Sequence, residues 1–232
     1  MAESGKGMLL VWMDIPAPEQ DDFNEWYDKE HLTDRVSVPG FLNGRRFQAL
    51  AGGPEFLAVY ETREPATLSS AAYRARLERP TPWTRRVMPH FRNTVRGVCE
   101  QTLRAGYGTG GILAALRFGP DPARRRPLRQ WLAESGLPRI AGQPGVLAAC
   151  LAEGVAEPAA KSPTAEVTLR GGPDRGVDWA ILVEGIAQGL VEQAARALLA
   201  DAAAAEGVPS LSAEVGVYRF LCGVAAEDAS QR

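Results

Sequence analysis

The chain has 232 residues, and its 26 Lys and Arg side chains nearly balance its 28 Asp and Glu side chains, which gives a formal net charge of -2. This balance produces no strong field toward nucleic acid or an anionic membrane, so neither is expected as a partner. Hydrophobic residues make up 45% of the chain and charged residues 23%, which are proportions typical of a globular protein with a buried core. No apolar stretch approaches the roughly 20 residues that cross a bilayer, and the N-terminus lacks the pattern of a secretory signal. We therefore expect a cytoplasmic protein.

The sequence contains few of the motifs that carry metal, nucleotide or hydrolase chemistry. Cys99, Cys150 and Cys222 are odd in number and each lies in an apolar run, so they are predicted to be reduced core residues. No His-x-x-x-His, Cys-x-x-Cys or Asp-x-Asp spacing is present, so no metal site is expected. Gly-x-x-x-x-Gly-Lys and Gly-x-Ser-x-Gly are also missing, which removes the usual signals of a P-loop nucleotide site and a serine hydrolase.

The first half reads as two helices among four strands. Prolines 16 and 18 end the first strand, because proline cannot continue a central strand, and Pro39-Gly40 ends the first helix. Ala-Gly-Gly-Pro between the second and third strands predicts a hairpin turn. The expected β-α-β-β-α-β elements are Met8–Ile15, Glu19–Val38, Phe41–Leu50, Phe56–Arg63, Pro65–Glu78 and Asn93–Leu103.

The second half repeats this order, and the register of shared residues indicates a duplication. Trp26 and Pro39-Gly40 recur as Trp131 and Pro144-Gly145, at a displacement of 105 (131 − 26). The third-strand block that starts at Glu55 recurs at Asp178, at a displacement of 123 (178 − 55). The second-half elements are expected at Ile112–Phe118, Pro122–Ile140, Val146–Val155, Trp179–Ile186, Leu190–Glu206 and Leu211–Val224.

The two displacements differ by 18 residues (123 − 105), so the second half carries an insertion before its third strand. The insertion falls within Ala156–Val177, which is rich in Pro, Gly and Ala. Such a composition is typical of an exposed hairpin extension or loop. We expect it to lie outside the core that the two halves share.

Two β-α-β-β-α-β units predict an α+β fold of two ferredoxin-like domains, residues 1–107 and residues 108–232. Each domain has a four-stranded antiparallel sheet with helices on one face, which leaves the other face uncovered. An exposed apolar sheet face is unfavourable, so we expect the two sheets to pack on each other within one chain as a fused α+β barrel. No second chain is then needed to close the barrel, and a homodimer through helices or sheet edges stays open.

A short segment of the first helix carries a family resemblance. Trp26, Tyr27 and His31, followed by the turn Pro39-Gly40-Phe41, resemble the dimeric α+β barrel superfamily and most closely its EthD-like branch. That superfamily includes cofactor-free monooxygenases, lactone isomerases, polyketide cyclases, haem-binding enzymes and members with no assigned activity. The resemblance implies a small apolar or aromatic ligand, and no cofactor is expected. Gly136 and Leu132 correspond to His31 and Tyr27, so a single site is expected.

His31 and Tyr27 are the candidate catalytic residues. Phe23, Tyr27 and His31 are spaced i, i+4 and i+8, so they share the helix face that meets the sheet. A neutral imidazole there can act as a general base, and the Tyr27 hydroxyl one turn away can orient a substrate oxygen. The alternative is a structural histidine near a helix C-terminus that bonds a backbone carbonyl.

Other residues are candidates for substrate contact beside Phe23. Arg46 and Arg45 point to opposite faces of their strand, so one of them can be enclosed and hold an anionic group. Trp12 lies on one face of the first strand, and Trp83 and His90 lie in a proline-rich connection that either crosses the cleft or packs as a loop. Haem needs an axial ligand, and the second half, where fused haem-binding relatives usually carry theirs, has no histidine.

Two functions follow from these residues and from the resemblance. The first is a cofactor-independent enzyme of monooxygenase, isomerase, cyclase or lyase type that acts on an aromatic or polyketide-like carbonyl or phenol. Its site would be the cleft between the first helix and the sheet of the first half. The rival is a non-catalytic or stress-associated barrel whose cleft holds a small apolar ligand or nothing.

Overall fold

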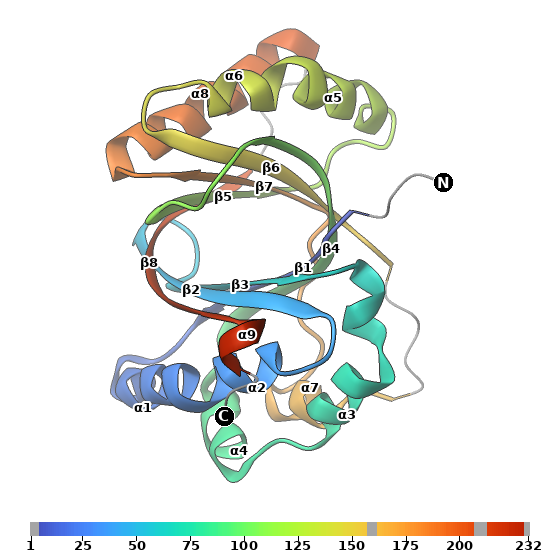
Figure 1. Ribbon diagram of the computed structural model, residues 1–232, viewed down its shortest axis with the longest axis vertical. Helices are drawn as coiled ribbons and strands as arrows, with labels where there is room; N and C mark the ends of the chain where they lie inside the picture. Colours follow the sequence, from blue (N-terminus) through green and yellow to red (C-terminus); the bar gives the residue numbers. More distant parts are fainter. Residues whose placement is uncertain (1–4, 157–161, 207–212, 230–232) are drawn as a thin grey trace.

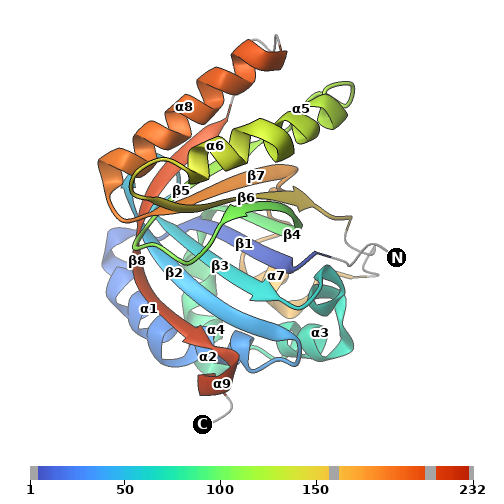
Figure 2. The same ribbon diagram turned by 45° about the horizontal axis from the view of Figure 1, so that its top comes forward.

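Eight strands pair antiparallel and edge to edge into a closed barrel, in the order β1-β3-β2-β8-β5-β7-β6-β4 (Figures 1 and 2). The computed structural model describes residues 5–156, 162–206 and 213–229. The predicted α+β fold of two ferredoxin-like halves is confirmed, because each half contributes four neighbouring strands. The strands are β1 Gly7–Asp14, β2 Phe41–Ala51, β3 Phe56–Thr62, β4 Arg92–Gly106, β5 Ile112–Phe118, β6 Val146–Gly154, β7 Trp179–Gly185 and β8 Glu214–Ala225.

Helices cover the outside of the barrel in two layers, one over each half (Figure 1). The second-half layer consists of α5 Arg125–Trp131, η5 Leu132–Gly136, α6 Leu137–Ala141 and α8 Gln188–Glu206. The first-half layer consists of η1 Ala17–Glu19, α1 Gln20–Trp26, η2 Tyr27–His31, α2 Leu32–Val36, η3 Pro65–Ser69, α3 Ala71–Glu78, α4 Pro82–Val87, η4 Met88–His90, α7 Ala165–Leu169 and α9 Ala226–Ala229.

Strand register confirms the duplication that the sequence predicts. Phe41 on β2 pairs with Thr62 on β3, and Val146 on β6 pairs with Gly185 on β7, which are the same positions displaced by 105 and 123. Both pairings have an irregularity immediately after these residues. The Pro-Gly turns also match, because Gly40 and Gly145 have φ of 97° and 78°, in the region that favours glycine.

Each half-sheet is also hydrogen-bonded to the other at its edges, through β2 with β8 and β4 with β6. The barrel interior is a buried cluster to which all eight strands contribute, and Trp12 and Tyr218 are among its largest side chains. One ion pair crosses this interior, with Arg45 donating to both carboxylate oxygens of Glu184 at 2.9 and 3.1 Å. Strand hydrogen bonds at two edges, apolar packing and this ion pair thus join the two halves.

The structure differs from the expectations for two connecting segments. The connection before β4, expected to cross the cleft or to pack as a loop, packs and contains a helix, because Thr81 accepts a hydrogen bond from the Thr84 amide and begins helix α4. The insertion of the second half was expected to be an exposed hairpin extension or loop, and this expectation is wrong. Its helix α7 lies against α3 and η4 of the first half (Figure 1), and Glu166 on it is only 3% exposed. Of the predicted elements, residues 157–161 of the insertion and 211–212 of the last strand lie outside the described residues.

The prediction for the three cysteines is met in part. Cys99 and Cys150 are buried, as predicted, whereas Cys222 is only partly buried and its sulfur lies 3.2 Å from Asp28 Oδ1. Within the described ranges, no group of three or more His, Cys, Asp or Glu side chains is placed to hold a metal ion. No helix in the same ranges is long and apolar enough to span a membrane.

Candidate functional site

The predicted helix from Glu19 to Val38 forms as one segment with a π-helical turn in its middle. The Leu32 amide donates to the Tyr27 carbonyl, five residues back, and the turn spans Tyr27–His31. Such turns are often found at functional sites. The second half has a π turn at the corresponding residues, Leu132–Gly136. The turn is therefore a property of the duplicated scaffold, and the side chains on it distinguish the two halves.

A cavity of about 370 Å³ lies between this helix, α3, the outer face of the first-half sheet and the insertion helix α7. Its size is within the range of small-molecule sites. Its wall combines apolar side chains with tyrosine, histidine, arginine and carboxylate groups. The residues that line it include Leu9, Val11, Tyr27, His31, Arg35, Tyr60, Leu68, Tyr73, Arg74, Leu77, Phe91, Arg96, Glu166, Arg170 and Asp174.

His31 lies in this wall and is 6% exposed. Its ring centroid is 4.1 Å from that of Trp26 and 4.9 Å from that of Tyr27, so aromatic packing holds the imidazole. Its Nδ1 atom is buried and has no hydrogen-bond partner among the described residues. Burial lowers the His31 pKa well below its usual value, and the positive charges of Arg35, Arg170 and Arg46 lower it further. The imidazole is therefore neutral at pH 7.

Two tyrosines form a buried hydrogen-bonded pair beside His31. The Tyr60 hydroxyl donates to the Tyr27 hydroxyl at 3.2 Å, which leaves the Tyr27 proton for another acceptor. Burial raises the pKa of both phenols, so both stay protonated. Gly44 makes this arrangement possible, because a Cβ there would lie 2.8 Å from Tyr60 Cδ1 and 2.9 Å from Leu32 Cδ1.

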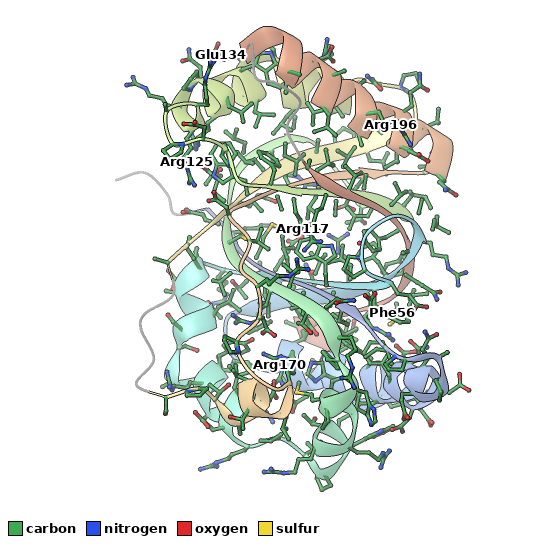
Figure 3. All side chains as sticks on the ribbon, turned by 180° about the vertical axis from the view of Figure 1, so that it is seen from behind. Phe56, Arg117, Arg125, Glu134, Arg170 and Arg196 are labelled. Atoms are coloured by element: carbon green, nitrogen blue, oxygen red, sulfur yellow. The ribbon has the colours of Figure 1, made fainter. Side chains whose placement is uncertain are left out.

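A buried ion pair joins the first-half helix to the insertion. Arg35 on α2 donates to Glu166 on α7, and each residue is 3% exposed. Burial raises the pKa of the Glu166 carboxyl despite the nearby Arg35 charge. Arg170, just after α7, donates to both oxygens of Asp174 at 2.6 and 3.1 Å and is labelled in Figure 3. The insertion thus contributes charged groups to a cavity of the other half.

Phe23 and Arg46 pack on the Tyr27 ring and do not line the cavity. The Phe23 ring is fully buried, with its centroid 5.3 Å from that of Tyr27. The Arg46 guanidinium lies 4.3 Å from the Tyr27 ring centroid, donates to Asn24 Oδ1 at 2.8 Å and pairs with Asp28. Arg46 thus packs on the Tyr27 ring and has its own polar partners.

Trp12, Trp83 and His90 lie away from the cavity. Trp12 faces the barrel interior, where the Arg117 guanidinium is 4.6 Å from its ring centroid. Arg117 is labelled between the two halves in Figure 3. Trp83 Nε1 donates to Asp22 at 2.9 Å, and the side chain of His90 is 35% exposed with Nε2 3.9 Å from a Glu19 oxygen. These placements contradict the expected substrate contacts. Trp12 could not be placed from the sequence, because the alternation of side chains along a strand does not say which face meets the helices. Trp83 lies on helix α4, which packs against α1.

Five residues of the cavity wall were not predicted from the sequence, namely Arg35, Tyr60, Tyr73, Glu166 and Arg170. Arg35 could have been found, because it continues the i+4 series of Tyr27 and His31 by one more turn. Tyr60 shares a strand face with Phe56, which packs on Phe23. No local pattern indicates Glu166 or Arg170, because their place depends on the docking of the insertion against the other half.

Comparison with known proteins defines the fold class. No family model and no curated protein matches this sequence. Among solved structures, the chain is similar to an anthrone oxidase-like protein, with 12% identity, a TM-score of 0.66, and 98% of this chain and 96% of that chain covered. It is also similar to a candidate monooxygenase from Fusobacterium nucleatum, with 7% identity, a TM-score of 0.61, and 97% and 96% covered.

A haem-binding protein from Thermus thermophilus is a further structural match, with 12% identity, a TM-score of 0.51, and 98% and 94% of the two chains covered. At such identities these matches show the fold alone. The chain thus shares with these proteins, over nearly its whole length, the fold of a closed barrel built from two ferredoxin-like halves.

Haem does not fit the second half of this chain. Both histidines of the chain, His31 and His90, are in the first half. Leu132 and Gly136, at the positions of Tyr27 and His31, offer no ligand atom for iron. The space between helices and sheet is filled there by a buried apolar cluster that includes Trp179. Between its helices and sheet, the described part of the second half therefore offers no axial ligand and no space for haem.

Proposed function

We propose that the cavity around His31 binds a small aromatic or polyketide-like molecule and that His31 acts on it as a general base without a cofactor. The observation that carries this proposal is a neutral, buried imidazole with an unpartnered nitrogen in the wall of a largely apolar cavity. A buried nitrogen without a partner is unfavourable, and a bound molecule can satisfy it. The motif around Tyr27 and His31, which resembles the EthD-like branch, supports the same assignment.

Proton abstraction is the step that the candidate reactions share. A neutral His31 can take a proton from a phenol or from an acidic carbon conjugated with a carbonyl. The Tyr27 hydroxyl, which receives the Tyr60 hydrogen bond, can then donate to the oxyanion that forms. In an isomerase-type reaction His31 returns the proton to another atom, whereas a monooxygenase-type reaction takes dioxygen as its second substrate.

Anthrone is a suitable probe, because a structural relative is described as anthrone oxidase-like and because loss of one methylene proton gives an aromatic phenolate. In D₂O without oxygen, His31 would remove that proton and the carbon would take a deuteron in its place. NMR measures this exchange directly. We expect exchange to be faster with the protein than in buffer, and His31→Gln to slow the catalysed part on the order of 10²–10⁴-fold.

The matched control is His90→Gln, which makes the same change at the other histidine, on the surface. It should leave exchange unchanged. Equal loss in both variants, at equal folded fraction, would contradict the role of His31.

A non-catalytic binding protein is the second candidate. It is favoured by one observation, namely that no described residue bonds to His31 Nδ1, whereas general bases are usually oriented by a third group. Under this alternative anthrone binds in the cavity, but exchange stays at the buffer rate in the wild-type protein. The same NMR samples therefore decide between the two candidates.

A further inference from the structure

Arginines outnumber carboxylates among the described residues that line the His31 cavity. Four arginines line it, Arg35, Arg74, Arg96 and Arg170, against the two carboxylates Glu166 and Asp174. The carboxylates are already engaged, because Glu166 pairs with Arg35 and Asp174 accepts two hydrogen bonds from Arg170. Among the described residues of the wall, these two pairs leave Arg74 without a carboxylate partner.

Arg74 supplies a positive charge to this wall. It lies on α3, is exposed to solvent and lines the cavity. Its side chain has no ion-pair partner within the part of the chain that the structure describes. An arginine of this kind at a cavity wall presents a planar set of donors that matches a carboxylate or phenolate.

The uncharged polar groups of the cavity also favour a negative ligand. Tyr60 donates to Tyr27, so Tyr27 has a proton left to donate, and the two hydroxyls form a chain of donors toward the cavity. Both phenols are buried and neutral. A hydrogen bond from a neutral phenol to an anionic oxygen is stronger than one to a neutral oxygen.

His31 responds to the same positive field. The charges of Arg35, Arg170 and Arg46 disfavour its protonated form. A negative ligand would offset this field, whereas a neutral ligand would leave it unchanged.

We infer that the ligand of this cavity is an aromatic anion, a carboxylate or a phenolate, whose charged oxygen is bound by Arg74 and the Tyr27 hydroxyl. Its ring system lies against the apolar part of the wall, which includes Val11, Leu68 and Leu77. This inference rests on the proposed function, because it takes the His31 cavity as the binding site. It adds the charge of the bound molecule, which the fold and the motif leave open.

The test compares two molecules of nearly equal shape, 1-naphthoate and the neutral 1-naphthamide, by isothermal titration calorimetry at pH 7.5. We expect 1-naphthoate to bind on the order of tenfold more tightly. Arg74→Gln should weaken 1-naphthoate binding by about twofold to fivefold and leave 1-naphthamide unaffected, since this arginine is exposed and partly screened. Tyr27→Phe should weaken 1-naphthoate more than 1-naphthamide.

Arg79→Gln is the matched control, because it removes the same charge just beyond the end of the same helix, at a residue that does not line the cavity. It should leave both affinities unchanged. An equal loss in Arg74→Gln and Arg79→Gln would overturn the inference, because the effect would then come from overall charge.

The outcomes separate this inference from the proposed function. Equal affinities for the two molecules, or tighter binding of 1-naphthamide, would overturn the preference for an anion and leave the proposed function standing. Binding of neither molecule would overturn both.

Discussion

The two halves of the barrel share one scaffold and differ in what fills the space between helices and sheet. Both have a tryptophan before a π turn, and both end the helix at a Pro-Gly turn with a positive glycine φ. In the first half the Trp26 ring lies on the His31 ring, and in the second half Trp131 lies against Gly136. The backbone has therefore been kept while the side chains have diverged.

Five polar side chains at or behind the candidate site have an apolar residue or glycine at the corresponding position of the second half. Four of these second-half residues are apolar, are at most 1% exposed and belong to one buried core cluster, namely Leu132, Ile140, Leu151 and Val183. The corresponding pairs are Tyr27 with Leu132, His31 with Gly136, Arg35 with Ile140, Arg46 with Leu151, and Tyr60 with Val183.

The covering helices differ as well. In the second half, α8 has 19 residues and packs Val191, Ala194 and Leu198 into the core. In the first half, α3 has 8 residues and buries only Tyr73. The space that α3 leaves open is closed by α7, which comes from the insertion of the second half. A short covering helix thus leaves a cavity, and both halves are needed to enclose it.

The largest expected effect comes from giving the first half the second-half residue at position 35. Arg35→Ile leaves the Glu166 carboxylate buried without a partner, which should lower the free energy of unfolding by about 3–5 kcal/mol. The double variant Arg35→Ile/Glu166→Leu should recover most of this loss, because it removes the unpaired charge. Urea denaturation measures both values. Arg35→Ile with wild-type stability would show that α7 is not held by this ion pair.

A smaller effect is expected from Gly136→Ala in the second half. A Cβ at this position would lie 2.7 Å from Trp131 Cζ3, and such overpacking costs about 1–3 kcal/mol. Gly189→Ala is the control, because nothing lies within 4 Å of a Cβ there, and thermal melts compare the two. Equal melting temperatures for Gly136→Ala and the wild type would contradict the packing of Trp131 on Gly136.

The third prediction concerns pH. The folded-state pKa of His31 lies well below 6.5, so the unfolded chain takes up the proton first as pH falls. The free energy of unfolding should therefore decrease below pH 6.5, by up to about 1.4 kcal/mol per pH unit, until the folded-state pKa is reached.

His31→Gln should remove this part of the pH dependence, whereas His90→Gln should keep it. Denaturation curves at pH 7.5 and pH 5.5 give the comparison. An unchanged slope in His31→Gln would mean that the imidazole is not buried in its neutral form.

The smallest effect is expected from the tyrosine pair. Tyr60→Phe removes the hydrogen bond to Tyr27 and should cost about 0.5–1.5 kcal/mol of stability. Tyr73→Phe is a matched change at another cavity-lining tyrosine, and it should cost less. Urea denaturation tests the order of the two variants, and the reverse order would contradict the Tyr60–Tyr27 hydrogen bond.

The sequence predicts the fold well because the duplication leaves residues in register. Trp26 with Trp131 and Gly40 with Gly145 fix the helix ends, and alternation along the strands fixes the sheet. The helix stripe also identifies His31 and Tyr27 as cavity residues. These features depend on residues close together in the chain, whose spacing the backbone geometry determines.

The rest of the site depends on contacts between distant segments. Arg35 meets Glu166 across 131 positions, and a Pro- and Gly-rich insertion has no periodicity that predicts docking.

Trp12 was expected at the cleft, but the alternation of side chains along a strand does not distinguish the face toward the helices from the face toward the barrel interior. His90 was expected near the site, and its place on the surface follows from helix α4.

The central claim is that a single ligand site surrounds His31, in the first half only. NMR of the two imidazole side chains during titration with 1-naphthoate tests it most directly, because the chain has only two histidines. The His31 signals should shift and saturate with the ligand, and the His31 pKa should rise as the negative charge offsets the nearby arginines, while His90 stays unchanged. Saturable shifts at Leu132 and Val183 with none at His31 would contradict the claim.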